Sequence, residues 1–242
     1  MNVAERPMLQ SVGDGIEATR SAWSFGGSVA ETFDEHVRRS VPGYDAGHEL
    51  VLQISDFFVH DDSVCYEIGS STGTLIRALA ERHAGRGSWI GVDIERAMVD
   101  FAVRRNEGSR VRFALADACR FDYQPCDLVV AYYTVQFVRP RDRQRLVDAL
   151  FQALNWGGAL LLFEKVRAPD ARFQDLCTGL YNDFKRGHDF SPAEIMAKSD
   201  SLRGVLEPFS SAANVDMLRR AGFVDVMSVF KQVCFEGFLA IK

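Results

Sequence analysis

The sequence lacks the features that mark several classes of protein. No segment approaches the ~20 consecutive apolar residues of a membrane-spanning helix, and the N-terminal MNVAERPMLQ has no apolar signal-peptide core. There is no basic tract, and the net charge of -5 argues against tight nucleic-acid binding. We therefore expect a cytoplasmic protein that binds neither membranes nor nucleic acids.

Cysteine is present but is not arranged for metal binding or cross-linking. The five cysteines, at positions 65, 119, 126, 177 and 234, form no CxxC pair and no cluster with histidine. This spacing argues against structural zinc, and the odd number argues against a disulfide framework. We expect reduced thiols and no metal site.

The composition is that of an ordinary globular protein. The chain has 242 residues, of which 47% are hydrophobic and 25% charged. That length suits one α/β domain or a domain with an added lobe. The sequence shows neither an internal repeat nor a low-complexity linker.

Strand-like and helix-like segments alternate through the middle of the chain. The strand-like segments are SVCYEIG, SWIGVD, RVRFALAD, CDLVVAYY and GALLLFEKV. Amphipathic runs separate them, which predicts a doubly wound, mostly parallel sheet. A helix ending at Gly222 precedes FVDVMSVF and VCFEGFLAIK, which are close enough to pair as an antiparallel hairpin. The prediction is a Rossmann-like, seven-stranded α/β fold.

Four regions follow from this pattern. Residues 1–43 are expected to be an N-terminal helical segment, and residues 44–168 the ligand-binding core. Residues 169–206 interrupt the alternation with two helices, Asp170–Arg186 and Pro192–Leu206, the second capped by Ser191. We expect this insertion to lie over the sheet as a lid. Residues 207–242 complete the core.

Ligands of open α/β sheets bind at the carboxyl ends of the strands. Gly69, Ser70, Ser71 and Gly73 follow the first predicted strand, with GxxxG spacing instead of the GxGxxG of dinucleotide binders. Asp93 follows the second strand and suits ribose hydroxyls, whereas Asp117 and Ala118 follow the third and suit an adenine amine. Each feature also has a structural explanation: the Gly/Ser loop as a tight turn, and each aspartate as a helix cap. Together they predict a pocket for an adenosine without a triphosphate.

Several segments carry a resemblance to a known family. RSVPGY (39–44), GVDIERAM (91–98), TVQF (134–137), LNWGGALLLFEK (154–165) and DFKRG (183–187) resemble carboxy-S-adenosylmethionine synthases, which act in tRNA wobble-uridine modification. The resemblance implies a class I methyltransferase fold, S-adenosylmethionine (SAM) as ligand, and a homodimer. The SAM-binding residues expected on this basis are Tyr44, Gly69, Ser70, Ser71, Asp93, Ile94, Asp117, Ala118, Tyr132 and Gln136.

The chain departs from that family at positions that bear on chemistry. Tyr132 stands where the family has asparagine, and Ser199 where it has an arginine that holds the product's extra carboxylate. Tyr181 and Asn182 stand where histidines are common. Serine cannot replace a bidentate arginine–carboxylate contact, although Lys198 and Arg203 are nearby in the sequence. These departures argue against carboxylate transfer from prephenate.

The remaining chemistry suggests that SAM reacts with itself. The α-amine would attack Cγ and expel methylthioadenosine, giving azetidine-2-carboxylate, as in azetidine-2-carboxylate synthases, which are also similar to this family. We assign Tyr132 to the sulfonium and Tyr181 and Asn182 to aiming the amine, as catalytic residues. Methyl transfer to a small molecule, residual carboxy-SAM synthesis and a silent SAM-binding subunit are the alternatives.

Some residues have a structural interpretation beside the functional one. Tyr181 and Asn182 would alternatively pack the lid or a dimer interface. His188 is a base or a solvated surface residue, and Glu164 and Lys165 would form an ion pair. Because side chains alternate along a strand, Tyr132 and Tyr133 are expected to point in opposite directions.

Overall fold

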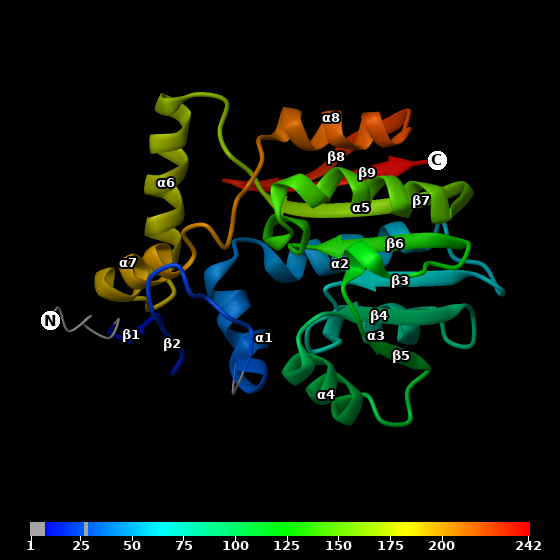
Figure 1. The fold of residues 1–242 in the computed structure, drawn as a ribbon, viewed down its shortest axis with the longest axis horizontal. Coiled ribbons are helices and arrows are strands. Elements are labelled where there is room, and N and C mark those ends of the chain that lie inside the picture. Colours follow the sequence, from blue (N-terminus) through cyan, green and yellow to red (C-terminus); the bar gives the residue numbers. More distant parts are fainter. Residues whose placement is uncertain (1–7, 27–28) are drawn as a thin grey trace, which may run out of the picture.

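The computed structural model describes residues 8–26 and 29–242, so that predictions for residues 1–7, 27 and 28 lie outside the described residues. Its centre is a seven-stranded sheet of order β5-β4-β3-β6-β7-β9-β8 (Figure 1). The strands are β3 (Val64–Ile68), β4 (Ser88–Asp93), β5 (Val111–Leu115), β6 (Cys126–Tyr132), β7 (Leu154–Lys165), β8 (Asp225–Gln232) and β9 (Phe235–Ile241). Strands β3 to β7 run parallel, and β9 pairs antiparallel with β7 and β8. The predicted fold class and terminal hairpin are confirmed.

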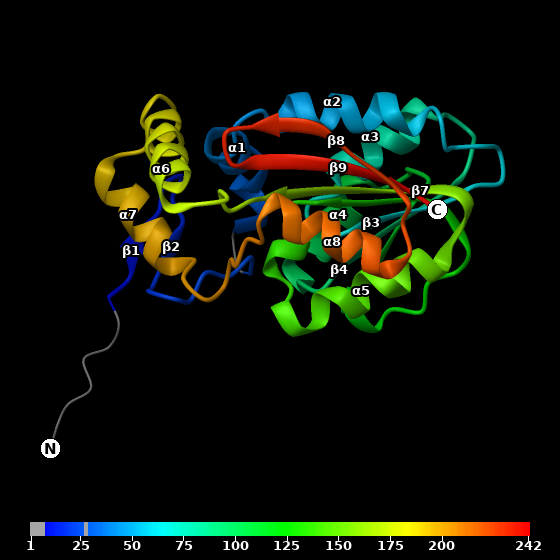
Figure 2. The ribbon, with the colours of Figure 1, turned by 90° about the horizontal axis from the view of Figure 1, so that it is seen from above.

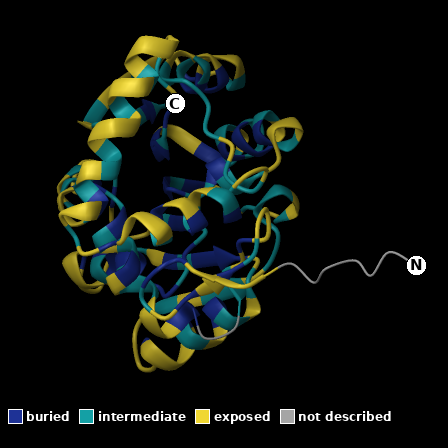
Figure 3. Cartoon of the chain, turned by 90° about the vertical axis from the view of Figure 1, so that its left-hand side faces the viewer, coloured by how far each residue is buried: buried dark blue, intermediate teal, exposed yellow. Residues whose placement is uncertain are grey.

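Helices cover both faces of this sheet (Figure 2). The helices of the described residues are α1 (Val29–Ser40), α2 (Tyr44–Ser55), α3 (Thr74–Arg82), α4 (Arg96–Arg105), α5 (Pro140–Ala153), α6 (Ala171–Arg186), α7 (Pro192–Ser201) and α8 (Ser211–Ala221). Apolar residues of α2 and α3 pack on one face, and those of α5 and α8 pack on the other. The strands between them are largely buried, and exposed residues gather on the outer helices (Figure 3).

Strand β6 shows how the sequence divides the core. Leu128, Val130 and Tyr132 join the cluster with α2 and α3, whereas Val129 and Ala131 join the cluster with α5 and α8. This is the alternation of a strand buried on both sides. It ends at Tyr132, because the next residue, Tyr133, has a left-handed backbone with φ of 58°.

The insertion, expected as a lid over the sheet, lies over the ends of the strands and not over a sheet face. Helices α6 and α7 stand beyond the carboxyl ends of the parallel strands, beside α1 and the short strands β1 (Gln10–Ser11) and β2 (Glu17–Ala18), and do not cover a sheet face (Figures 1 and 2). Backbone hydrogen bonds join Ser21 to Asp200 (2.9 Å) and Trp23 to Ser201 (3.1 Å). The N-terminal segment and the insertion therefore form one roof above the strand ends.

Two details of the predicted elements change. The described part of the first 43 residues holds one helix, α1, after the β1–β2 pair. Helix α7 begins at the predicted Ser191 cap, which forms a capping box with Glu194, but it ends at Ser201. Gly204, with φ of 71°, turns the chain away after it. No described helix is long and apolar enough to cross a membrane.

Candidate active site

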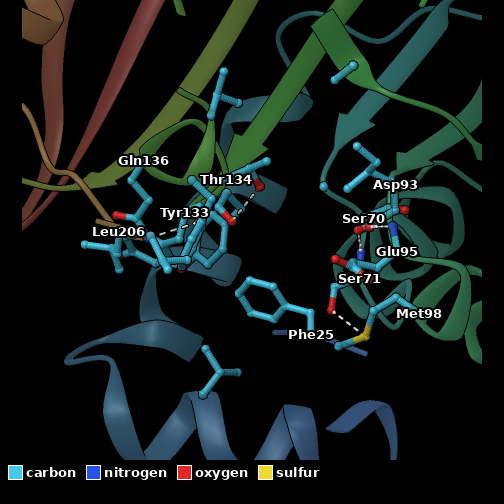
Figure 4. A pocket seen from close by; sticks show the side chains of 18 of the residues that line it. Phe25, Ser70, Ser71, Asp93, Glu95, Met98, Tyr133, Thr134, Gln136 and Leu206 are labelled. Carbon is cyan, nitrogen blue, oxygen red and sulfur yellow. Dashed lines mark hydrogen bonds between the residues drawn. The ribbon is translucent and has the colours of Figure 1, made fainter. Parts of the chain in front are cut away.

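A cavity of about 860 Å³ opens at the carboxyl ends of the parallel strands. Its floor comes from the residues that follow β3, β4, β5 and β6, and its roof from α1, α6, α7 and the segment around Trp23. Figure 4 shows that Ser70, Ser71 and Asp93 lie on one side and that Tyr133 and Gln136 lie on the other, with Phe25 between. Ligands of this sheet type are expected in this place.

Asp93 lies at one end of the cavity, as predicted for a ribose partner. Its Oδ2 accepts from the backbone N–H of Ser71 (2.8 Å) and its Oδ1 from that of Glu95 (2.9 Å). Each oxygen keeps a further lone pair for a ligand hydroxyl. Burial raises the pKa of Asp93. The carboxylate is therefore fixed in position before any ligand arrives.

The loop after β3 forms a close-fitting cradle. Gly69 has φ of 69°, and a Cβ there would lie 2.3 Å from the Thr134 Oγ1. The buried hydroxyl of Ser70 has no hydrogen-bond partner among the described residues, and Ser71 is left-handed as well, with φ of 49°. Left-handed backbone in a non-glycine residue is uncommon and concentrates at ligand sites. The predicted loop lines the cavity in a conformation suited to ligand contact.

Asp117 and Ala118 also line the cavity, together with the exposed side chain of Ile94. Asp117 Oδ1 accepts from the backbone N–H of Cys119 (2.9 Å), so it caps the short helix η1 (Ala118–Arg120). Asp117 therefore caps a helix and also lines the cavity, so that one role does not exclude the other.

The two tyrosines at the end of β6 do not point in opposite directions, and that prediction is wrong. Their rings meet edge to face with centroids 4.6 Å apart, in the same apolar cluster. The positive φ of Tyr133 breaks the strand alternation and turns its ring to the side of Tyr132. Both rings line the cavity.

The hydroxyl groups of this pair differ in their partners. Tyr132 donates to the backbone carbonyl of Tyr44 (2.7 Å), directly beneath Gly47, where a Cβ would lie 2.2 Å from the hydroxyl oxygen. The buried Tyr133 hydroxyl has no partner among the described residues. Burial raises the pKa of both phenols, which stay neutral. Tyr133, which the sequence analysis left out of the site list, has the hydroxyl that remains available to a ligand.

Gln136 lines the cavity but its amide is used within the protein. Its Nε2 donates to the carbonyl of Tyr133 (3.1 Å), and its Oε1 accepts from the N–H of Lys165 (2.8 Å). This side chain therefore holds the strained Tyr133 backbone against the end of β7. We interpret Gln136 as a positioning residue.

Tyr44 and Tyr181 line the cavity as predicted, whereas Asn182 is not among the lining residues. Tyr181 donates to the carbonyl of Ser40 (2.9 Å) and so ties α6 to α1. Successive residues of a helix point about 100° apart, which turns Asn182 away from the direction of Tyr181. Tyr181 therefore lies on the cavity wall, whereas Asn182 does not.

Other residues considered from the sequence lie outside the cavity. The exposed Ser199 and Arg203 do not line it, and Arg203 pairs with Asp200 (3.1 Å). His188 Nδ1 lies 2.8 Å from the Phe184 carbonyl, outside the lining. Arg203 does not replace the missing arginine in this structure.

The expected Glu164–Lys165 ion pair is absent among the described residues. Glu164 is buried, and its pKa is raised to about 8 by burial. Lys165 instead places its Nζ 4.4 Å from the centre of the Tyr181 ring. Neighbouring strand residues face opposite sides of a sheet, which separates the two charges.

Several lining residues were not predicted from the sequence as site residues. Glu67, on β3, is buried, and its Oε2 accepts from the Ile76 N–H (3.0 Å). Burial raises the pKa of Glu67 well above its usual value. Lys198 contacts His36 Nε2, and both line the cavity. The one signal in the sequence was an acidic residue, Glu67, within a strand-like apolar run. No local pattern pointed to His36.

Comparisons with known proteins agree with this geometry. Residues 66–158 match the family described as methyltransferase domain. The carboxy-S-adenosyl-L-methionine synthase of Staphylococcus epidermidis is 33% identical over 221 residues, covering 91% of this chain and 97% of that protein. The synthase of Campylobacter lari is 35% identical over 222 residues, covering 91% and 94%. The chain belongs to the carboxy-S-adenosyl-L-methionine synthase family.

The solved structures agree on the fold of this family member. The S-adenosylmethionine-dependent methyltransferase SibL superposes with a TM-score of 0.59 at 20% identity, over 82% of this chain and 55% of that one. SAM is accordingly the substrate or methyl donor. In the cavity, backbone N–H groups hold Asp93 in place, and Ser70 and Tyr133 have buried hydroxyls without hydrogen-bond partners among the described residues. No three His, Cys, Asp or Glu side chains in the described ranges gather as a metal site.

Proposed function

We propose that this protein cyclises SAM. The α-amine of the methionine arm attacks Cγ, so that a C–N bond forms and the C–S bond breaks. The electron pair of the broken bond stays on sulfur, which leaves as the neutral thioether of methylthioadenosine. Loss of the extra amine proton gives azetidine-2-carboxylate. The reaction needs no second substrate.

The observation that carries this proposal is the chemical character of the wall beyond Gly69. Aromatic rings and two lysines line it: Tyr44, Tyr133, Tyr181, Phe235, Lys165 and Lys198. Burial and nearby positive charge both disfavour an ammonium ion, so this wall favours the neutral, nucleophilic amine. A fixed sulfonium charge is stabilised by ~0.5–2 kcal/mol on an aromatic face.

Glu67 is suited to receive the amine proton. It lines the cavity at the end of β3, and the burial that raises its pKa well above the usual value favours the protonated carboxyl, the state that it reaches once it has taken the amine proton. Its second oxygen, Oε1, is not engaged by the Ile76 N–H. We assign Tyr133 to the sulfonium, with Tyr132 and Tyr181 as positioning residues whose hydroxyls bond to backbone.

The serine at position 199, where the resemblance implies an arginine, supports a change of chemistry within the family. Ser199 is exposed, and Arg203 pairs with Asp200 outside the cavity. Lysine is a point charge and does not reproduce the planar, bidentate contact of arginine with a carboxylate. Ser199 therefore offers no bidentate contact to the extra carboxylate of a carboxy-SAM product.

The test is an incubation of the purified protein with SAM alone, followed by mass spectrometry. We expect methylthioadenosine and a four-carbon cyclic amino acid in equal amounts, above a control without protein. The Glu67→Gln variant is expected to retain SAM binding and to lose most of the turnover. Intact SAM after prolonged incubation would remove the proposal.

A second function is favoured by the size of the cavity. At about 860 Å³ it lies towards the upper end of the ~300–1,000 Å³ range of ligand sites, which leaves room for an acceptor beside SAM. Methyl transfer predicts S-adenosylhomocysteine only when an acceptor is added. Carboxy-SAM synthesis, the activity named for the relatives, predicts a product only when prephenate is added.

We also propose that the protein is a homodimer in the cytoplasm, with α6 at the interface. Phe173, Leu176 and Leu180 lie on one face of α6, and each is more than half exposed, at 53%, 56% and 58%. An exposed apolar stripe of this kind marks an interaction surface. Roof helices at an interface would exclude water from the cavity beneath them.

A further inference from the structure

Three lysines gather at the end of the cavity that lies farthest from Asp117. Lys165 is the last residue of β7, Lys185 lies on α6, and Lys198 lies on α7. The ring of Tyr181 is flanked by the Nζ atoms of Lys165 at 4.4 Å and Lys185 at 4.2 Å. Lys165 and Lys198 line the cavity. Two helices of the roof and one strand of the sheet therefore bring positive charge to one place.

These charges lack acidic partners within the described residues. Among the described residues, Lys231 on β8 is the one lysine that forms an ion pair. The acid whose charge acts on Lys198 is Asp14, but Asp14 is bonded to Arg39 and to His36 Nδ1 (2.6 Å). Aromatic faces offset part of the positive charge, since Lys198 Nζ lies 5.2 Å from the centre of the Trp23 ring. A positive excess remains at the cavity wall.

The titration of the lysines agrees with a missing anion. Burial lowers the pKa of Lys198 to about 7, with Lys185 contributing. Burial likewise lowers the pKa of Lys185 to about 8, with Lys165 contributing. Buried charges of one sign are costly unless a counter-charge joins them. A bound carboxylate would supply it.

The order of the strands indicates which carboxylate reaches this place. Along the sheet the order is β5, β4, β3, β6, β7, so the strand ends present Asp117, Asp93, Gly69, Tyr133 and Lys165 in turn. With the nucleoside at Asp117 and Asp93, the methionine arm extends past Gly69 towards Tyr133. The lysines come next.

We propose that Lys165 and Lys198 bind the α-carboxylate of the methionine arm of SAM, with Lys185 as a supporting charge behind Tyr181. The inference deepens the proposed function and rests on its use of SAM as the reacting molecule. A carboxylate held by the lysines is kept away from Cγ, so that the amine is the nucleophile left to attack. Attack by the carboxylate oxygen would instead close a lactone.

The test compares two ligands that differ by the amino-acid arm. Calorimetry measures the affinities of SAM and of methylthioadenosine for the wild type, Lys165→Met and Lys198→Met. We expect each variant to lose about 10- to 100-fold in affinity for SAM and to keep its affinity for methylthioadenosine within about twofold. Retained methylthioadenosine binding also shows that the variant is folded. Arg203→Met, which removes an exposed cation from the same region, is the matched control and should change neither affinity.

A second comparison uses only the wild type. Decarboxylated SAM lacks the α-carboxylate and keeps the sulfonium and the amine, and we expect it to bind about 10-fold or more weakly than SAM. Equal affinities of these two ligands would overturn the proposal, as would equal losses for SAM and methylthioadenosine in the lysine variants. Repeated in the Glu67→Gln background, which is expected to bind SAM without turnover, these binding measurements do not depend on whether SAM is cyclised.

Discussion

At the scale of single residues, the adjacent tyrosines of β6 offer a matched pair of substitutions. Tyr132→Phe removes the hydrogen bond to the Tyr44 carbonyl and is expected to lower the free energy of unfolding by ~0.5–1.5 kcal/mol. Tyr133→Phe removes a hydroxyl without a protein partner, so stability should change by less than ~0.5 kcal/mol. Turnover should fall more for Tyr133→Phe than for Tyr132→Phe. Urea unfolding and methylthioadenosine release measure the two effects, and the reverse order of turnover would return Tyr133 to a packing role.

Asp93 provides the test of the nucleoside end. Asp93→Ala removes both carboxylate oxygens that order Ser71 and Glu95 and face the cavity. We expect SAM affinity to fall by ~10-fold or more, because a charged, buried hydrogen-bond partner is lost. Calorimetry checks this, with Asp93→Asn to separate the charge from the hydrogen-bond geometry. Unchanged affinity in the alanine variant would contradict the ribose assignment.

The buried Glu164 is expected to make stability depend on pH. Burial raises its pKa from 4.5 to about 8 in the folded protein. Between these values the folded state binds more protons at this group than the unfolded chain does, so a rise in pH through this window lowers stability. Glu164→Gln removes this contribution. Its Tm relative to wild type should therefore increase between pH 5 and pH 8.5, and a constant difference would show that Glu164 is ionised when folded.

At the scale of elements, the β3–α3 loop depends on the space around Gly69. Gly69 and Gly85 both have positive φ, at 69° and 89°, but a Cβ on Gly85 would meet nothing within 4 Å. Both alanine variants should lose ~1 kcal/mol from backbone strain. Only Gly69→Ala should also lose SAM binding, since its Cβ collides with Thr134. Equal SAM affinity in the two variants would show that the cradle tolerates the shift.

The elements were predictable where a local pattern determines them. The apolar run of β6 and the Ser191 cap of α7 are local signals, and the structure has both. Tyr133 was predicted to point away from Tyr132, because side chains alternate along a continuing strand. Its positive φ ends that alternation and turns its ring to the same side as that of Tyr132. Lys165 and Lys198 meet across 33 residues of chain by way of α6 and α7, and no local periodicity encodes that meeting.

At the scale of the whole molecule, the apolar stripe of α6 predicts an assembly. Leu176→Glu combined with Leu180→Glu places two charges on this face, which is exposed in a single chain. We expect the wild type to be a dimer and the double variant a monomer, because charges at the centre of an apolar interface are strongly unfavourable. Light scattering after size exclusion measures the mass. Thr178→Glu introduces a charge on the same helix at an exposed polar residue and should leave the mass unchanged.

The joining of the first residues to the insertion bears on how the chain folds. Ser21 and Trp23 bond to Asp200 and Ser201, and Ser40 bonds to Tyr181, so the cavity cannot be closed until residues about 180 positions apart have met. Contacts so distant in sequence form slowly, because a long loop must be ordered first. The β3–β6 floor pairs residues 63 positions apart, such as Cys65 and Leu128, so it closes a much shorter loop. A chain still being synthesised would therefore possess the nucleoside floor well before it possesses the lysines above it.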